Sequence, residues 1–160
     1  HLPTRRQRQM CIRDSSLSDA FCVDRYRSEF LDLVRTHVDI LFGNETELLS
    51  LYQVENLNEA IGLVQDDCEI AAVTRDSRGS IVIENRRVFE IAAQKIDTVI
   101  DTTGAGDLYA SGFLYGITRD MDIRQCGRIG GLVASSIITQ FGARPEESLM
   151  PLIDRVAVPN

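Results

Sequence analysis

The seven residues from Asp101 to Asp107, with the sequence DTTGAGD, could do chemistry on a phosphate group. Gly104 and Gly106 can adopt backbone angles that are closed to other residues, and they let a ligand come close to the main chain. The segment opens an expected helix, so its free N–H groups would lie at the positive end of a helix dipole. Such an end binds anions and stabilises charge that develops on a transferring phosphoryl group.

Asp107 lies in the first turn of the expected helix, where the dipole favours an ionised carboxylate. Such a carboxylate can orient an attacking hydroxyl and accept its proton, as phosphoryl transfer requires. No G-K-[ST] follows, so the segment is not a Walker A loop, and Asp107 and Ala110 break the spacing of a G-x-G-x-x-G fingerprint. Without further context, a glycine-rich helix start with a capping aspartate remains the alternative interpretation.

The surrounding chain predicts helices that alternate with strands. Expected helices cover residues 23–35, 45–52, 58–66 and 123–139, and a further helix opens within 101–107 and runs to about residue 117. Expected strands cover 38–42, 70–74, 80–84 and 88–92. The last two strands should pair as a hairpin, and residues 76–79 should form a turn. This alternation implies an α/β fold with a mainly parallel sheet under helical cover. The helix at 123–139 is rich in Gly, Ala and Ser, so it should pack tightly against a sheet or another helix.

Composition and charge exclude several classes of protein. The chain has 160 residues, 44% hydrophobic and 26% charged, which is typical of one globular domain. It has no run of about 18 uncharged apolar residues, so a membrane-spanning helix is excluded. A net charge of −7 argues against a general nucleic-acid or membrane surface. The four cysteines are scattered, so we expect neither a zinc site nor a disulfide framework, and we expect a cytoplasmic location.

Residues 1–16 differ from the rest of the chain. They contain four arginines and one aspartate and show no apolar periodicity. The run QMCIRDS at 9–15 looks like translated sequencing-adapter text, and a basic arm is the alternative. We therefore expect residues 1–16 to be non-native and residues 17–160 to form the domain, inside a longer reading frame.

DTTGAGD followed by LYASGFLYG closely resembles the second signature of the ribokinase/PfkB family of sugar and nucleoside kinases. The segment Asn44-Glu45-Thr46-Glu47 matches the N-x-x-E motif of that family, and residues 18–23 and 113–116 are most similar to its adenosine-kinase-like bacterial branch. The resemblance runs from about residue 17 to 155. It implies a ribokinase-like three-layer αβα fold, of which this chain holds the C-terminal, ATP-binding half without the lid.

The resemblance implies roles for the DTTGAGD segment. Asp107 would be the catalytic base, and the amides of Gly104, Ala105 and Gly106, with Thr103, would surround the phosphates of ATP. The cofactors would be ATP and Mg²⁺, and the other partner would be a small sugar or nucleoside.

Asn44 and Glu47 would, by the same resemblance, help to place Mg²⁺ and the phosphates through water. The chemistry agrees, because Mg²⁺ takes oxygen ligands and keeps several waters. Without the family context, Asn44 would be a helix cap and Glu47 its capping-box partner.

Two further loops match the family less closely. Thr74 and Gly79 belong to a segment that resembles the T-x-G-x-x-G nucleotide loop, but Asp76 replaces the middle glycine, which puts a close approach of that backbone to the nucleotide in doubt. The positions that hold a monovalent cation, often K⁺, in many relatives correspond to three residues here: Asp101, Thr103 and Gly142. An ordinary turn residue is the alternative for Asp101.

Three residues near the end of the small-residue helix have two interpretations. Ser135, Ile138 and Thr139 either line an adenine pocket or simply pack.

The chemistry expected of the whole protein is therefore ATP-dependent phosphoryl transfer to a sugar or nucleoside hydroxyl. The alternative is a nucleotide-binding fragment or pseudokinase without transfer, because family members are about twice as long and the acceptor-binding half is absent. A sheet cut in this way exposes an unpaired edge and an apolar flank. We expect the chain alone to be inactive, and either poorly soluble or a homodimer.

Overall fold

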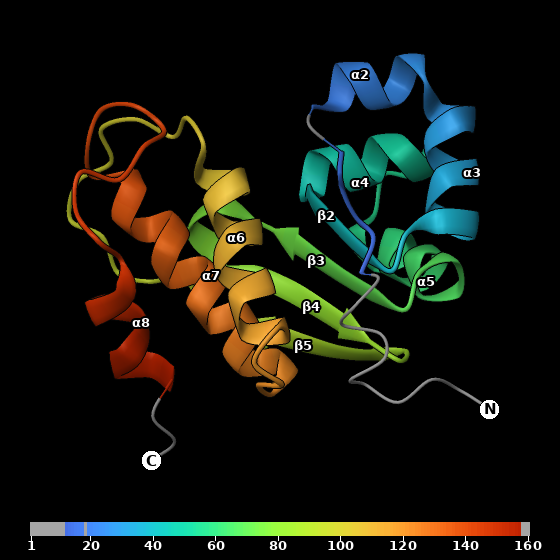
Figure 1. Ribbon diagram of the computed structural model, residues 1–160. Helices are drawn as coiled ribbons and strands as arrows, with labels where there is room; N and C mark the ends of the chain where they lie inside the picture. Colours follow the sequence, from blue (N-terminus) through green and yellow to red (C-terminus); the bar gives the residue numbers. More distant parts are fainter. Residues whose placement is uncertain (1–11, 18, 158–160) are drawn as a thin grey trace. The chain divides into compact units, whose positions relative to one another are not determined.

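A computed structural model describes residues 12–17 and 19–157, and these form two compact units. The first unit comprises the residues up to Arg75 together with 81–90, and the second comprises 76–80 and the residues from Ile91 onward. Ser18, the first residue of the segment 18–23, lies outside the described residues. The elements, labelled in Figure 1, are β1 (Asp14–Ser16), α2 (Ala20–Arg25), α3 (Arg27–His37), β2 (Ile40–Asn44), α4 (Glu45–Tyr52), α5 (Leu57–Asp67), β3 (Ile70–Thr74), the 3₁₀ turn η2 (Asp76–Arg78), β4 (Ser80–Glu84), β5 (Arg87–Ile91), α6 (Ala105–Ile117), α7 (Ile123–Ile137) and α8 (Met150–Ala157).

The first unit contains nearly all of a five-stranded sheet with the order β1-β2-β3-β4-β5. β1, β2 and β3 run parallel, and Asn44 at the end of β2 is paired with Thr74 at the end of β3. β4 and β5 are joined by the two-residue turn Asn85-Arg86, whose φ angles of 48° and 64° are those of a tight hairpin, so this pair is antiparallel. The sheet is therefore mixed.

Alternate residues of the central strands form the core of the first unit. Leu41, Val73 and Ile83 are buried at 1% exposure or less on one face of the sheet. Helices α2, α3, α4 and α5 contribute apolar side chains to the same cluster. One layer of helices therefore covers this face, as strands with a period of two require.

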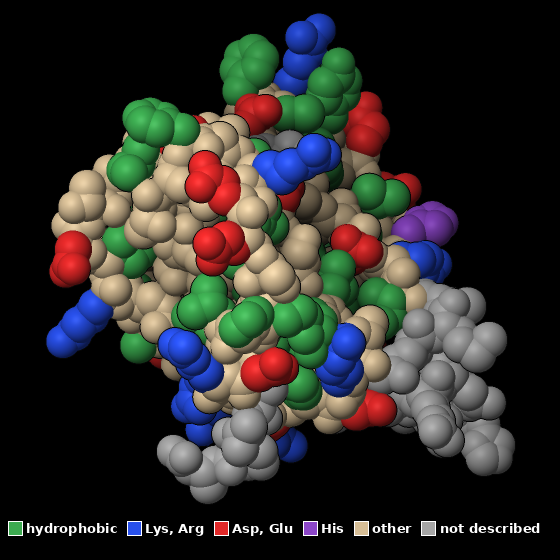
Figure 2. Space-filling view, turned by 60° about the vertical axis from the view of Figure 1, so that its left-hand side comes forward, with side chains coloured by type: hydrophobic (Ala, Val, Ile, Leu, Met, Phe, Trp, Pro, Cys, Tyr) green, Lys and Arg blue, Asp and Glu red, His purple; other side chains and the backbone are tan. Residues whose placement is uncertain are grey.

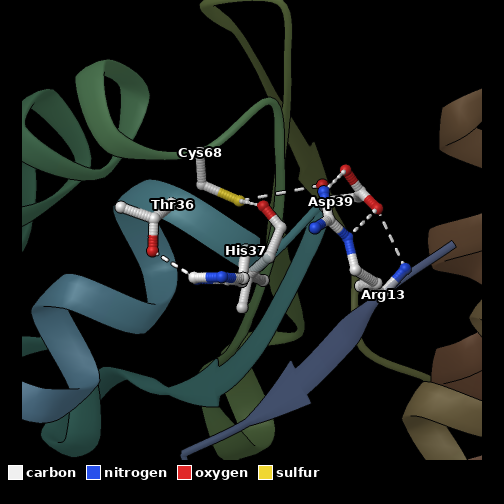
Figure 3. A network of polar contacts seen from close by, with 6 residues as sticks. Arg13, Thr36, His37, Asp39 and Cys68 are labelled. Carbon is white, nitrogen blue, oxygen red and sulfur yellow. Dashed lines mark hydrogen bonds and ion pairs between the residues drawn. The ribbon is translucent and has the colours of Figure 1, made fainter.

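A network of polar contacts holds the beginnings of β1 and β2 in the first unit (Figure 3). The carboxylate of Asp39 accepts from the backbone N–H of Arg13 at 2.9 Å and from its Nε at 3.3 Å. The Cys68 thiol donates to the carbonyl oxygen of Ile70 at 3.1 Å, and burial raises the pKa of this thiol. Within the described part of the chain, no disulfide joins Cys22, Cys68 and Cys126.

Helices α6 and α7 pack closely in the second unit, because glycines lie between them. A Cβ at Gly112 would come within 3.0 Å of the Cα of Gly130, and a Cβ at Gly116 would come within 2.8 Å of the Cys126 Sγ. α8 adds Ile153 to a small cluster with Ile129 and Val133 of α7. The expected tight packing of the small-residue helix is confirmed, with another helix as its partner.

Several element bounds differ from the expected ones. The helix expected at 23–35 is divided into α2 and α3 at Tyr26, whose ψ of 32° leaves the helical range. β2 begins two residues later than expected, and α7 ends at 137. Strand β1 lies inside the stretch 1–16, and α8 lies in a segment for which no element was expected.

Surface charges on the face shown in Figure 2 are interspersed, with Lys and Arg side chains among Asp and Glu side chains. Within the described part of the chain, no helix has both the length and the apolar character needed to cross a lipid bilayer.

Candidate functional site

At the N-terminus of α6, Gly104 adopts the special backbone conformation that was expected, whereas Gly106 lies inside the helix without a positive φ. Gly104 caps the helix with a φ of 79°, in the left-handed region that favours glycine. A Cβ there would lie 2.5 Å from the Cβ of Ala143, so only glycine fits beside that residue. A Cβ at Gly106 would meet nothing within 4 Å, so the space beside this residue is open.

Of the four N–H groups of residues 104–107, three have no partner within the described chain. The N–H groups of Gly104, Gly106 and Asp107 donate to no other described residue. Ala105 differs from the expectation, because its N–H donates to the carbonyl oxygen of Thr102 at 3.1 Å. The helix end therefore offers three amides, at the positive end of its dipole.

Asp107 is the third residue of α6 and is exposed. Its carboxylate makes no hydrogen bond or ion pair with the residues that the structure describes, while its carbonyl oxygen accepts from the Ser111 hydroxyl at 2.8 Å. An exposed, unpaired carboxylate beside free amides can accept a proton from a bound hydroxyl.

The carboxylate of Asp101 joins two loops of the second unit. Its Oδ1 accepts from the Thr103 N–H at 2.9 Å and from the Thr103 hydroxyl at 2.7 Å, and its Oδ2 accepts from the Gly142 N–H at 3.0 Å. These bonds lower the pKa of Asp101, and the bonds from Thr103 have the largest effect. The three residues proposed for a monovalent cation are thus brought together, by hydrogen bonds within the protein.

The loop that resembles a nucleotide-binding loop begins at the carboxyl end of β3. Asp76, which replaces a glycine of the family pattern, has a φ of 51° and so adopts the left-handed conformation that a glycine would favour. Gly79 has a φ of 82°, and a Cβ there would lie 2.0 Å from the carbonyl oxygen of Ile91. Aspartate thus preserves the turn, while its side chain occupies space that a glycine would leave open.

Asn44 and Glu47 form a complete capping box at the start of α4, in the first unit. The Glu47 N–H donates to the Asn44 Oδ1 at 2.8 Å, and the Asn44 N–H and Nδ2 donate to the two carboxylate oxygens at 2.8 Å and 2.9 Å. Glu47 is only 6% exposed, and burial raises its pKa. Each of these oxygens already has a protein donor, so the pair suits a cation held through water better than one bound directly.

A cavity of about 520 Å³ lies in the second unit between the segment 95–100 and the last turns of α7. Ser135 and Thr139 are among its lining residues. The carbonyl oxygen of Ile138 instead accepts from the N–H groups of Ile100 and Asp101, at 2.7 Å and 3.4 Å. Ile138 is not among the residues that line the cavity, and its backbone holds the start of the DTTGAGD segment.

One pair of residues close to the site was not predicted from the sequence. The hydroxyls of Ser80 and Tyr109 lie 2.8 Å apart, and each side chain is 2% exposed. A tyrosine two residues after Asp107 was a visible signal, but its partner lies 29 residues upstream, in a segment that was expected to be a hairpin strand.

A family model described as the pfkB family carbohydrate kinase matches residues 4–149. The chain is similar to two solved structures at high identity. It is 48% identical to a probable sugar kinase from Rhizobium etli, covering 89% of this chain and 43% of that one with a TM-score of 0.86. It is 45% identical to an adenosine kinase from Sinorhizobium meliloti, covering 90% and 44% with a TM-score of 0.87.

A third solved structure is the nucleoside kinase of Methanocaldococcus jannaschii, described as an archaeal member of the ribokinase family. It is 26% identical, with 91% of this chain and 48% of that chain covered and a TM-score of 0.78. The chain spans less than half the length of the curated relatives that it matches first. Together, the family match and these shared folds show that this chain belongs to the pfkB family of carbohydrate kinases and has an α/β, ribokinase-like fold.

Proposed function

We propose that the protein transfers the γ-phosphoryl group of ATP to a hydroxyl of a sugar or nucleoside. The observation that carries this proposal is the N-terminus of α6, where three unpartnered N–H groups accompany the exposed carboxylate of Asp107. The hydroxyl attacks the γ-phosphorus in line, the bond between the γ-phosphorus and the β–γ bridging oxygen breaks so that ADP leaves, and Asp107 accepts the proton of the hydroxyl. The N–H groups of Gly104, Gly106 and Asp107 donate to the phosphate oxygens, where negative charge develops.

The remaining residues have separate proposed tasks. Asn44 and Glu47 of the first unit would hold Mg²⁺ through water, and this ion offsets the charge of ATP when bound. Asp101 accepts from Thr103 and Gly142, and these three residues would hold K⁺. Thr74 and the turn up to Gly79 would contact the nucleotide.

The cavity beside α7 is the proposed site of the adenine base. Its volume of about 520 Å³ lies within the range usual for small-molecule sites. The chain lines it with apolar side chains such as Ile100 and Leu132 and with hydroxyl groups such as that of Thr139. Adenosine is the first acceptor to test, because an adenosine kinase is 45% identical.

We place the reaction in the cytoplasm, where ATP is abundant and thiols such as Cys68 stay reduced.

A nucleotide-binding function without transfer is the second candidate. The coverage of the three solved relatives favours this candidate for the chain alone. The chain covers 43% to 48% of their length, so part of the acceptor site would belong to the part that it does not cover. We propose that the 160-residue chain by itself binds nucleotide and does not turn over.

The test is ATP consumption by the chain expressed with its upstream coding sequence, assayed with adenosine, ribose and fructose. Asp107→Asn should lower turnover by at least about 100-fold, which is the usual contribution of a positioned acid or base. The matched control is Asp154→Asn, which neutralises an exposed aspartate of α8. An equal rate in wild type and Asp107→Asn would refute the role of Asp107, and the lack of turnover with any acceptor would favour the second candidate.

A further inference from the structure

The hydroxyl pair of Ser80 and Tyr109 connects two parts of the proposed site, both within the second unit. Tyr109 lies two residues after Asp107 on α6, and Ser80 directly follows the turn that ends at Gly79. Both side chains are 2% exposed, so water does not compete for the 2.8 Å hydrogen bond between them. The bond is therefore a direct link between the helix of the proposed base and the proposed nucleotide loop.

Neither partner of this bond is free to move. The ring of Tyr109 lies against Gly130 of α7, where a Cβ would come within 3.2 Å of two ring carbons, and it stacks on Phe113 with 6.3 Å between the centroids. On the other side, Gly79 is held within its turn by the bond from its N–H to the carbonyl oxygen of Asp76 at 3.1 Å. The hydroxyl pair thus joins two segments that are each fixed by their own packing.

We propose that Tyr109 is a positioning residue, which sets the distance between the first turn of α6 and the loop at 76–79 through its hydrogen bond to Ser80. This inference rests on the proposed function, because that function places the catalytic base in the first turn of α6 and the nucleotide beside the loop at 76–79. Tyr109 is 2% exposed and in this proposal acts through Asp107, not by contact with a substrate. Phosphoryl transfer depends on alignment, so a small displacement of the base lowers the rate of transfer more than the affinity for ATP.

Burial supports this role. It raises the pKa of Tyr109 to about 12, so the phenol keeps its proton and remains able to donate. A phenylalanine would fill the same space and leave the Ser80 hydroxyl without its partner.

The experiment compares Tyr109→Phe, Ser80→Ala and the double variant, each expressed with the upstream coding sequence and assayed for kcat, for KM of ATP and for thermal unfolding. Each single variant should lower kcat by about 10- to 100-fold, the cost of a small misplacement of reacting groups. The KM of ATP should change by less than about threefold, and the double variant should be no slower than the slower single one, because the same bond is lost. Tyr115→Phe, which removes a hydroxyl further along α6, is the matched control and should keep its kcat.

The outcomes separate this inference from the proposed function. A kcat that stays at the wild-type value in Tyr109→Phe, with only a lower unfolding temperature, would show a purely structural hydroxyl and overturn the inference, while a slow Asp107→Asn in the same assay would still uphold the function. Additive losses in the double variant would also overturn it. If the unmodified protein phosphorylates no acceptor, the proposed function fails and this inference fails with it.

Discussion

Glu47 has a structural role whatever it contributes to metal binding. Its buried carboxylate completes the capping box of α4, and burial raises its pKa above the ordinary value of 4.5. The folded state therefore binds this proton more tightly than the unfolded state, so the stability linked to Glu47 is greatest at low pH and falls as pH rises from 4.5 through the raised pKa. The quantity to compare is the free energy of unfolding of wild type minus that of Glu47→Gln. We expect this difference to be smaller at pH 7 than at pH 4.5.

Urea unfolding at low protein concentration, at these two pH values, measures that difference. The control is Asn56→Ala, which removes the cap of α5, where the Asn56 side chain accepts from the Asn58 N–H at 2.8 Å. This variant should cost about 1 kcal/mol at both pH values, since the lost cap is not an acid. A difference for Glu47→Gln that is flat or rises with pH would contradict the assignment.

Asp101 responds to pH in the opposite direction. Its pKa is lowered by the bonds from Thr103 and then by that from Gly142, so its contribution is present above the ordinary value of 3.8 and is lost as pH falls through the lowered pKa. We expect Asp101→Ala to accelerate hydrogen exchange of the Gly142 amide, because this N–H loses its acceptor. The Cys68 amide, which donates to Val64 in the other unit, is the internal reference. Unchanged exchange at Gly142 would mean that Asp101 does not hold the loop.

Individual site residues could be predicted to different degrees. The local motif identified Gly104 and Asp107, since the conformation of a helix start depends on residues adjacent in the chain. The sequence did not predict that Ala105 uses its N–H in a turn, nor that Ile138 fixes residues 100 and 101 through its carbonyl oxygen. These bonds depend on backbone geometry that residue types do not encode.

At the scale of elements, the packing of α6 on α7 depends on which glycines face the partner helix. A Cβ at Gly130 would lie 2.8 Å from the Tyr109 carbonyl oxygen, whereas a Cβ at Gly131 would meet nothing within 4 Å. We expect Gly130→Ala to destabilise the protein by about 1–3 kcal/mol through overpacking. Gly131→Ala should be neutral or stabilise by up to about 1 kcal/mol, because alanine favours the helix.

The midpoints of urea unfolding for these two variants test the prediction as a pair. The variants make the same chemical change at neighbouring positions, so helix propensity contributes equally to both and the difference reports packing alone. Equal midpoints would show that the two helices are not in close contact at Gly130.

The elements that the sequence predicted well have strong local signals. The bounds of α4, β3 and β4 match the expected ones, because their apolar patterns are bordered by caps or turns. β1 has only three residues, of sequence DSS, and no apolar pattern, so it forms only because β2 offers it hydrogen-bonding partners. The break at Tyr26 also escaped prediction, because no Pro or Gly marks it.

At the scale of the whole molecule, the chain covers less than half of its relatives and has exposed apolar side chains. Phe21 is 76% exposed and Phe141 is 82% exposed. β1 and β5 are the outer strands of the described sheet order. Unpaired strand edges and apolar surface promote association.

We therefore predict that the 160-residue chain precipitates or sediments as a dimer, and that expression with the upstream coding sequence suppresses this. Analytical ultracentrifugation of both forms is the measurement. A soluble monomer of 160 residues that turns over ATP at the rate of the longer form would contradict both this prediction and the proposed inactivity of the short chain.

The proposed domain boundary between residues 16 and 17 also stays a prediction. Asp14–Ser16 form β1, and the family model already matches from residue 4.

The sequence by itself determined the α/β class, the family and the helix start that carries Asp107, because periodicity, caps and glycine positions act over a few adjacent residues. Only the tertiary structure decided which distant groups meet. It paired Asn44 with Thr74 at the ends of parallel strands, tied Asp101 to Gly142, and brought the hydroxyls of Ser80 and Tyr109 together. Such contacts depend on strand register and helix packing, which are properties of the whole folded chain.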